Sequence, residues 1–150
     1  MSSSITFYGP EKPYFELANY YPSPILLEGV EWPTVEHYFQ AQKTQLSNWK
    51  EKIRLASTPD ESKKLGWEVP DYDDEKWLSE RESVMEKAVR AKFDQHENLR
   101  ELLLSTGDAT LVEDSPKDTF WGMVDGEGEN KMGELLMKLR EEYRSSESVD

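Results

Sequence analysis

The chain has 150 residues, contains no cysteine and carries a formal net charge of -13, from 31 acidic and 18 basic side chains. This length predicts one domain built around a single core, and the lack of cysteine excludes disulfides, thiolate zinc sites and a cysteine nucleophile. The negative charge disfavours bulk binding to nucleic acid or anionic lipid, because that binding depends on clustered Lys and Arg.

No stretch of the chain has the composition of a targeting or membrane segment. The first residues lack a basic region followed by an apolar one, and nowhere do roughly 18 consecutive apolar residues occur. We therefore expect a soluble, cytoplasmic protein without a membrane partner. The oligomeric state is left open by the sequence.

Residues 5–30 are rich in aromatic residues, proline and glycine, a composition typical of strands and turns. Short strands are predicted at 5–8 and 25–27, and another at 110–113. Residues 67–80 are expected to form an acidic surface loop. Helix signals dominate the rest of the chain. Helix starts are predicted from a cap at Ser47, from a capping box at Thr58–Glu61 whose helix is closed by Gly66, and from a helical turn at Ser115. Apolar residues at helical spacing predict further helices at 84–93, 99–103 and 132–143.

These elements predict an α+β fold, a compact and mainly helical single domain with a few short strands. The sequence contains no internal repeat that would divide it further. The domain is predicted to span residues 5–144, with disordered ends at 1–4 and 145–150.

The most informative stretch, residues 31–43, places three polar side chains along one stripe of a helix. Thr34 can cap the start of this helix. Glu36, Gln40 and Lys43 then fall within a narrow sector at about 100° per residue, beside an apolar sector. The stripe is about 10 Å long at 1.5 Å per residue, so Lys43 reaching back could share a small ligand with Glu36.

Two roles are open for this stripe. Charges at this spacing usually mark a solvated helix face, where ion pairs are weak. The flanking aromatic residues Trp32, Tyr38 and Phe39 could instead form one wall of a site. If Glu36 is catalytic, its place in the first helical turn favours the ionised form, so it would act as a base or an electrostatic stabiliser.

A second candidate group lies in residues 115–122. Ser115 and Asp118 have the spacing of a capping box variant, so Asp118 is either a structural cap or a catalytic carboxylate. Trp121 is correspondingly either a core residue or part of a site. The glycine-rich stretch 125–130 is a weak signal for phosphate binding, because three carboxylates accompany its two glycines.

The sequence argues against metal and serine hydrolases. His37 and His96 are the only histidines, and neither they nor the carboxylates have the spacing of a metal site. His37 is better explained as a structural helix residue. No serine lies in a nucleophile-elbow pattern, and no metal or cofactor is expected.

Four ordered blocks resemble the NADAR family, which includes YbiA-type N-glycosidases of riboflavin biosynthesis intermediates. The blocks read FELANYYPSPI at 15–25, WPTVEHYFQAQK at 32–43, AKFDQH at 91–96 and SPKDTFWG at 115–122. The resemblance extends over residues 5–144 and includes the closing NKMGELLMKLR at 130–140. It implies a compact, mainly helical α+β fold.

The resemblance also implies a reaction and a set of site residues. The reaction is cleavage of an N-glycosidic bond between ribose phosphate or ADP-ribose and a nitrogenous base. The residues it carries over are Glu36, Asp118 and Lys43 as catalytic groups, and Trp77, Trp121, Asn19 and Gly122 as substrate-binding groups. Two departures concern the substrate: Trp67 stands where relatives usually have arginine, with no basic residue in 68–74, and Val124 replaces a frequent glycine.

The chemistry of the reaction suits these residues. Breaking a C1–N bond builds positive charge on the ribose ring, which Glu36 could stabilise while Asp118 orients water. Lys43 could protonate the leaving nitrogen or trap ring-opened ribose as a Schiff base. Trp77 and Trp121 offer stacking faces to the leaving base.

Three functions therefore remain open. The first is hydrolysis of ribosylaminopyrimidine intermediates of riboflavin biosynthesis. The second is removal of ADP-ribose from guanine bases, against which the acidic surface argues if the base is part of an extended nucleic acid. The third is a module that binds ADP-ribose or a nucleotide without turnover. In each case the expected partner is a small molecule, either a ribosylated base or an ADP-ribose conjugate.

Overall fold

The computed structural model describes residues 3–147 and divides into two compact units. The first unit contains the described parts of Met1–Ala18 and Glu97–Asp150, and the second contains Asn19–His96. Helices dominate and the strands are short, which confirms the predicted α+β, mainly helical fold. Over residues 3–147, no helix has the length and apolar character needed to cross a membrane.

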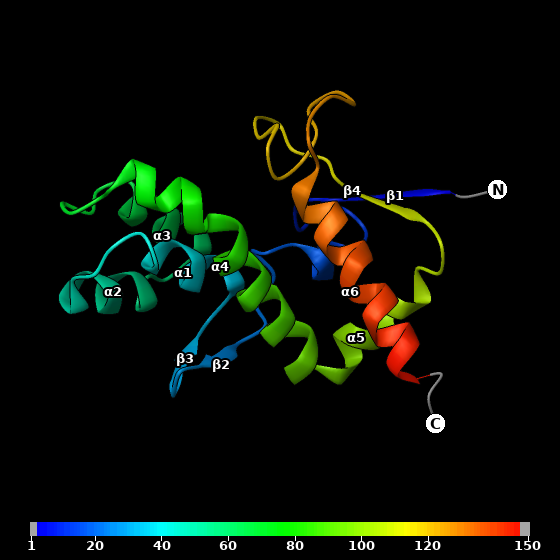
Figure 1. Cartoon of the computed structure of the whole chain (residues 1–150), viewed down its shortest axis with the longest axis horizontal. Coiled ribbons are helices and arrows are strands. Elements are labelled where there is room, and N and C mark those ends of the chain that lie inside the picture. The colour runs from blue at the N-terminus through cyan, green and yellow to red at the C-terminus, as the bar shows by residue number, and fades with distance from the viewer. Residues whose placement is uncertain (1–2, 148–150) are drawn as a thin grey trace. The chain divides into compact units, whose positions relative to one another are not determined.

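The second unit is built around a short, buried helix. α2, α3 and α4 all pack against α1, which lies among them in Figure 1. Every residue of this seven-residue helix is buried, so tertiary packing stabilises a helix that would be too short to persist alone. In chain order the unit contains β2 (Ile25–Leu27), β3 (Val30–Trp32), α1 (Val35–Ala41), α2 (Ser47–Arg54), α3 (Pro59–Gly66) and α4 (Asp74–Gln95).

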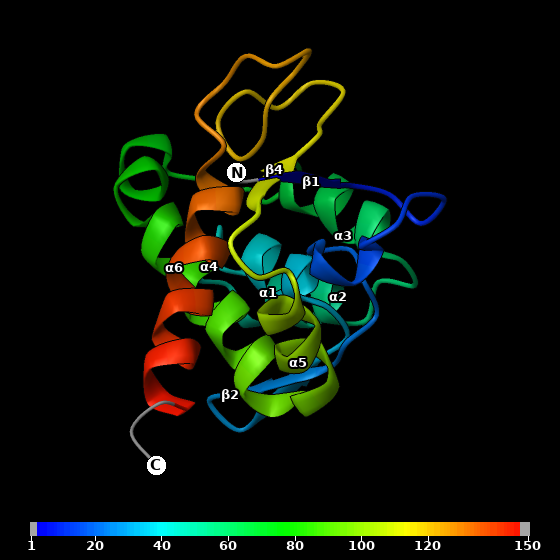
Figure 2. The same cartoon turned by 90° about the vertical axis from the view of Figure 1, so that its right-hand side faces the viewer.

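The first unit packs a helix against a pair of parallel strands. β1 and β4 run side by side, as Figure 2 shows. Their parallel register places Ser4 opposite Thr110. α6 contacts both β4 and α5, and Gly133 allows its close approach, because a Cβ there would lie 2.0 Å from the Leu111 carbonyl oxygen. In chain order the unit contains β1 (Ser4–Phe7), the 3-10 helix η1 (Phe15–Leu17), α5 (Glu97–Ser105), β4 (Thr110–Glu113) and α6 (Lys131–Glu147).

Several local predictions are confirmed. The Thr34 hydroxyl accepts a hydrogen bond from the His37 backbone N–H at 3.1 Å, so Thr34 caps α1 as expected. Thr58 caps α3 in the same way, with Pro59 as the first helical residue. The strands predicted at 25–27 and 110–113 are present with those bounds.

The predicted acidic loop at 67–80 is wrong in its second half. α4 begins at Asp74, and the Asp73 side chain caps it by accepting from the Lys76 backbone N–H. The acidic residues that suggested a loop lie in the first helical turn, where they favour the helix because its N-terminus carries partial positive charge. Trp77 is consequently a buried helix residue.

Two predicted helix starts are also wrong. Ser47 is the first residue of α2, and the cap position is Leu46, which has no side-chain oxygen to offer. Ser115 begins a series of turns instead of a helix. Its backbone N–H donates to the Met123 carbonyl at 2.9 Å, which draws the chain toward a neighbouring turn.

The described ends differ from the predicted domain limits. Ser4 already belongs to β1, and α6 continues through residues 145–147 to Glu147. Residues 1–2 and 148–150, the rest of the predicted disordered ends, lie outside the described residues. η1 and β3 were not predicted from the sequence, since neither has a strong local signal.

Candidate active site

The predicted polar stripe of α1 is present, and its first two members are buried together. Glu36 is 7% exposed and Gln40 is 3% exposed. Gln40 Nε2 donates a hydrogen bond of 2.6 Å to Glu36 Oε2, which offsets part of the cost of burying the carboxylate. The burial shows that this stripe is not a solvated helix face.

Gly66, at the end of α3, sets the position of this pair. A Cβ on Gly66 would lie 2.2 Å from Gln40 Oε1, so a side chain there would push the Gln40 amide out of its present position. The φ of Gly66 is not positive, so its role is close approach and not a left-handed helix end. Gly66 thereby keeps Gln40 in place against Glu36.

Asn19 lies next to Glu36 through the backbone. Its carbonyl accepts a hydrogen bond of 3.3 Å from the Glu36 backbone N–H. The Asn19 side chain is buried and points Nδ2 at the sulfur of Met85, at 3.5 Å. Asn19 thus lies beside the backbone of Glu36, and its role as a site residue stays a prediction.

Lys43 follows the end of α1, in a turn where its backbone N–H donates to the Gln40 carbonyl. Its ammonium nitrogen lies 4.7 Å from the ring centroid of Trp67 and 5.8 Å from that of Trp77. Over residues 3–147 this ammonium makes no hydrogen bond or ion pair. The helix predicted to run through Lys43 ends two residues before it, at Ala41, so Lys43 lies in the turn that follows α1.

The surroundings of Lys43 lower its pKa. Burial disfavours the charged amine and is the largest cause, the nearby charge of Glu36 opposes it, and Lys63 lowers the pKa further. An amine of this kind gives up its proton more readily than an exposed lysine. It can serve as a proton donor to a leaving group or as a nucleophile.

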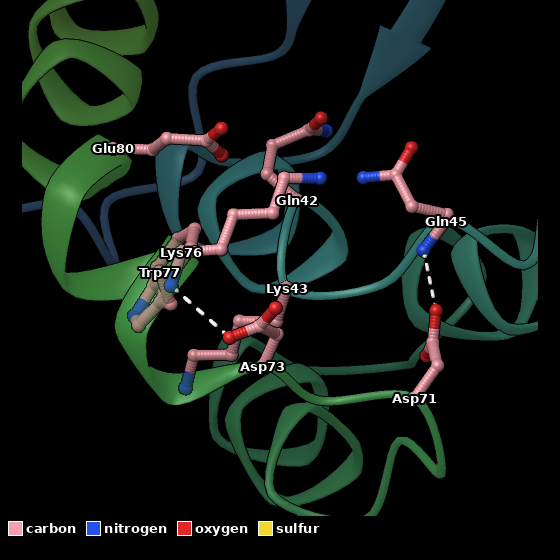
Figure 3. A pocket seen from close by; sticks show the side chains of 8 residues that line it. All are labelled: Gln42, Lys43, Gln45, Asp71, Asp73, Lys76, Trp77 and Glu80. Carbon is pink, nitrogen blue, oxygen red and sulfur yellow. Dashed lines mark hydrogen bonds between the residues drawn. The ribbon is translucent and has the colours of Figure 1, made fainter.

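A pocket of about 170 Å³ opens beside Lys43, between the turn after α1 and the start of α4 (Figure 3). Trp77 forms part of its wall, although only 7% of that residue is exposed and its ring packs on Phe39 with a centroid distance of 4.9 Å. Asp71 is held at the rim by the Thr44 hydroxyl and the Gln45 backbone N–H, at 2.5 and 2.8 Å. The lining residues are Gln42, Lys43, Gln45, Asp71, Asp73, Lys76, Trp77 and Glu80.

The structure thus brings Asn19, Glu36, Lys43 and Trp77 together in the second unit. The sequence did not predict the rim residues Asp71, Lys76 and Glu80, because residues 67–80 were interpreted as a surface loop. Trp77 lies eight residues before Met85, at helical spacing. Extending the apolar pattern back to Trp77 would have predicted that α4 already includes Lys76 and Glu80.

The other predicted residues, Asp118, Trp121 and Gly122, lie in the first unit. Asp118 Oδ1 accepts hydrogen bonds of 2.8 Å from the backbone N–H groups of both Phe120 and Trp121. Asp118 therefore has the structural function of a cap in a turn, and its catalytic role remains a prediction. Trp121 is half-buried, with its ring edge-on to Phe120 at 4.9 Å.

Gly122 has a packing role. A Cβ there would lie 2.4 Å from the Glu113 carbonyl oxygen. The neighbouring loop 125–130 gives no support to the weak phosphate signal, because the backbone N–H groups of Glu127, Glu129 and Asn130 already donate to protein carbonyls.

Both histidines have structural hydrogen bonds. His37 Nδ1 lies 2.8 Å from the Thr34 hydroxyl, and Nε2 lies 3.0 Å from the Ala56 carbonyl oxygen. Burial lowers the pKa of His37, which favours the neutral ring. His96 Nε2 lies 2.6 Å from the Pro24 carbonyl oxygen. Among residues 3–147, no three His, Asp or Glu side chains form a group that could hold a metal ion.

Comparison with known proteins agrees with this fold. The NADAR domain family matches residues 6–144. The N-glycosidase YbiA of Escherichia coli is 44% identical over 139 residues, which cover 92% of this chain and 87% of that protein. A riboflavin biosynthesis protein of Vibrio vulnificus is 41% identical over 145 residues, which cover 96% of this chain and 40% of that protein.

The fold is shared with a solved relative. The NMR structure of Escherichia coli YbiA superposes with a TM-score of 0.87 at 40% identity, covering 100% of this chain and 90% of that one. A match of this extent to proteins named N-glycosidases assigns the chain to the glycosidase class of enzymes. The chain belongs to the NADAR family, which confirms the resemblance seen in its sequence blocks.

Proposed function

We propose that the chain hydrolyses the C1–N bond between a ribose phosphate and a nitrogenous base, with ribosylaminopyrimidine intermediates of riboflavin biosynthesis as its substrates. The observation that carries the proposal is the pairing of a buried, hydrogen-bonded carboxylate, Glu36, with the amine of Lys43 beside a pocket. Its relatives are named as N-glycosidases and as a riboflavin biosynthesis protein, which supports both the reaction and the substrate class.

Glu36 supplies the negative charge in this mechanism. As the C1–N bond breaks, positive charge develops on the ribose ring, and a fixed carboxylate stabilises it at no cost of reorganisation. The 2.6 Å hydrogen bond from Gln40 holds that carboxylate in one orientation. Burial strengthens its electrostatic effect, because water does not screen the charge.

Lys43 supplies the proton that the leaving base needs. The C1–N electron pair goes to the departing nitrogen, the Lys43 ammonium donates a proton to it, and a water oxygen forms the new bond to C1. That water loses a proton, which returns to the Lys43 amine and restores the ammonium. The lowered pKa of Lys43 makes this donation easier than from an exposed lysine.

Asp118 is proposed as the second carboxylate, which orients the attacking water. One of its oxygens is occupied by the two backbone N–H groups of Phe120 and Trp121. These bonds fix the direction of the carboxylate and leave Oδ2 for a water molecule. Trp121 is proposed as a contact to the base.

The pocket volume favours a small substrate over an ADP-ribose conjugate. Sites for drug-sized ligands have volumes of about 300 to 1,000 Å³. The pocket beside Lys43, at about 170 Å³, is below that range, so it can enclose one part of a substrate, such as the sugar or the base, and suits the smaller substrate better than an ADP-ribose conjugate. Removal of ADP-ribose from guanine is therefore the second candidate, and a binding module without turnover is the third.

One assay separates the three candidates. The protein is incubated in parallel with a ribosylaminouracil phosphate and with ADP-ribosylated guanosine, and the products are identified by mass spectrometry. Release of the aminouracil base alone supports the proposal, and release of guanosine alone would replace it with the second candidate. Saturable binding of ADP-ribose with no base released from either compound would identify a binding module.

A further inference from the structure

Trp67 exposes more of its surface than any other large hydrophobic residue described between residues 3 and 147. It is 72% exposed, whereas Trp77 is 7% exposed and packs its ring on Phe39. A heterocycle stacks only on a ring face that is open to it. Most of the Trp67 ring is open, whereas only a small part of Trp77, at the pocket wall, is open.

Local structure fixes Trp67 at this place. It directly follows the last residue of α3, and its backbone N–H donates to the carbonyls of Lys63 and Lys64, both at 3.2 Å. Gly66, the residue before it, lies against Gln40 with no room for a side chain. Trp67 is therefore anchored to the same stripe of α1 that holds Glu36.

Trp67 also borders the pocket through Lys43. The Lys43 ammonium lies 4.7 Å from the Trp67 ring centroid, and Lys43 lines the pocket. A cation occupies only one face of an indole, and the 72% exposure shows that most of the Trp67 surface stays open.

The charges at the rim indicate what kind of ring would be accepted. Three carboxylates, from Asp71, Asp73 and Glu80, line the pocket together with the amines of Lys43 and Lys76. The two amines offset two of the three carboxylates, so the rim has little net charge with which to attract an ionised ring. Stacking on an indole requires no charge, so a flat and uncharged heterocycle fits this rim.

We propose that Trp67 is a substrate-contacting residue, which stacks on the leaving base and selects a flat, uncharged heterocycle. This inference rests on the proposed N-glycosidase function, because it names the part of the substrate that this face of the site holds. It assigns a role to a residue that Figure 3 leaves outside the pocket lining.

The test measures equilibrium binding, so it does not depend on turnover. Two probes are titrated by calorimetry into the full chain: a free aminouracil base, and ribose 5-phosphate, which has no base. The variants are Trp67→Ala, Trp67→Phe and Trp49→Ala. Trp49 is the matched control, because its ring holds the Lys52 ammonium at 4.6 Å in the same kind of contact and does not line the pocket.

Trp67→Ala is expected to weaken base binding by about ten- to a hundredfold, the usual effect of removing one stacking partner, and to leave ribose 5-phosphate binding unchanged. Trp67→Phe should restore most of the affinity, and Trp49→Ala should bind both probes like the wild type. Equal binding of the base by the wild type and Trp67→Ala would overturn the inference, as would an equal loss for both probes. Intact base binding without any turnover of ribosides would refute only the proposed function.

Discussion

Substitution of Gly66 by alanine would test how the buried pair on α1 is held. The new Cβ would lie 2.2 Å from Gln40 Oε1, so the Gln40 side chain must move. That movement breaks the 2.6 Å hydrogen bond to Glu36 and leaves a buried carboxylate without this donor. Gly66 itself contacts no proposed reacting group, so a loss of activity passes either through Gln40 or through the neighbouring Trp67.

Two opposing terms set the size of the effect on stability. Alanine in place of glycine near a helix end gains up to about 1 kcal/mol of helix propensity. Loss of a hydrogen bond to a buried charged group costs about 1.5 to 3 kcal/mol. We expect Gly66→Ala to lower the free energy of unfolding by about 1 to 2 kcal/mol, which lowers Tm by roughly 2 to 8 °C for a chain of this size. Turnover should fall at least tenfold.

The assay combines thermal unfolding with turnover and includes a double-mutant cycle. Gln40→Ala removes the side chain that Gly66→Ala would strike, so the double variant should lose less stability than the two single losses added together. Gly9→Ala is the matched control, since a Cβ there meets nothing closer than 3.4 Å. Unchanged stability and turnover in Gly66→Ala, or strict additivity in the cycle, would refute the reasoning.

Three further outcomes are expected. Asp118→Asn should lower kcat by orders of magnitude with Tm nearly unchanged, because asparagine keeps an oxygen for the two backbone N–H groups; a lower Tm with normal turnover would show that Asp118 is only a cap. If Lys43 is the proton donor, the rate should fall on the basic side of the pH–rate profile, at a pH below the ordinary lysine pKa, because burial lowers the pKa of Lys43. A rate that rises through that range would instead indicate a nucleophilic amine. Trp77→Ala should lower the free energy of unfolding by about 3 kcal/mol or more, because it removes a buried ring packed on Phe39, and unchanged stability would contradict this core role.

The local parts of the fold could be predicted from sequence because their causes are local. Thr34 and Thr58 cap their helices through hydrogen bonds to residues only three positions away. The start of α4 was missed because clustered acidic residues are common both in loops and in first helical turns, and only the burial of Trp77 decides between them. The hairpin of β2 and β3 was missed because its turn has Glu28 before Gly29. Asparagine is the usual residue at that position, where Glu28 has a φ of 55°.

The candidate site was predicted in its residue types but not in its environment. Glu36 and Lys43 were identified from their spacing and from the family blocks. Trp67 and Trp77 come to lie around the Lys43 amine only through the packing of α3 and α4 against α1. No sequence period encodes such a contact, so the lowered pKa of Lys43 could not have been foreseen.

The most direct test of the central claim is the rate at which Glu36→Gln releases base from a ribosylaminouracil phosphate, measured by mass spectrometry against the wild type. The substitution keeps the volume of the side chain and an oxygen that can accept from Gln40 Nε2, so Tm should change little. It removes the charge that stabilises the developing positive ring. The proposed mechanism predicts that turnover is abolished in a folded protein, and a variant that retains most of the wild-type rate would remove Glu36 from the mechanism.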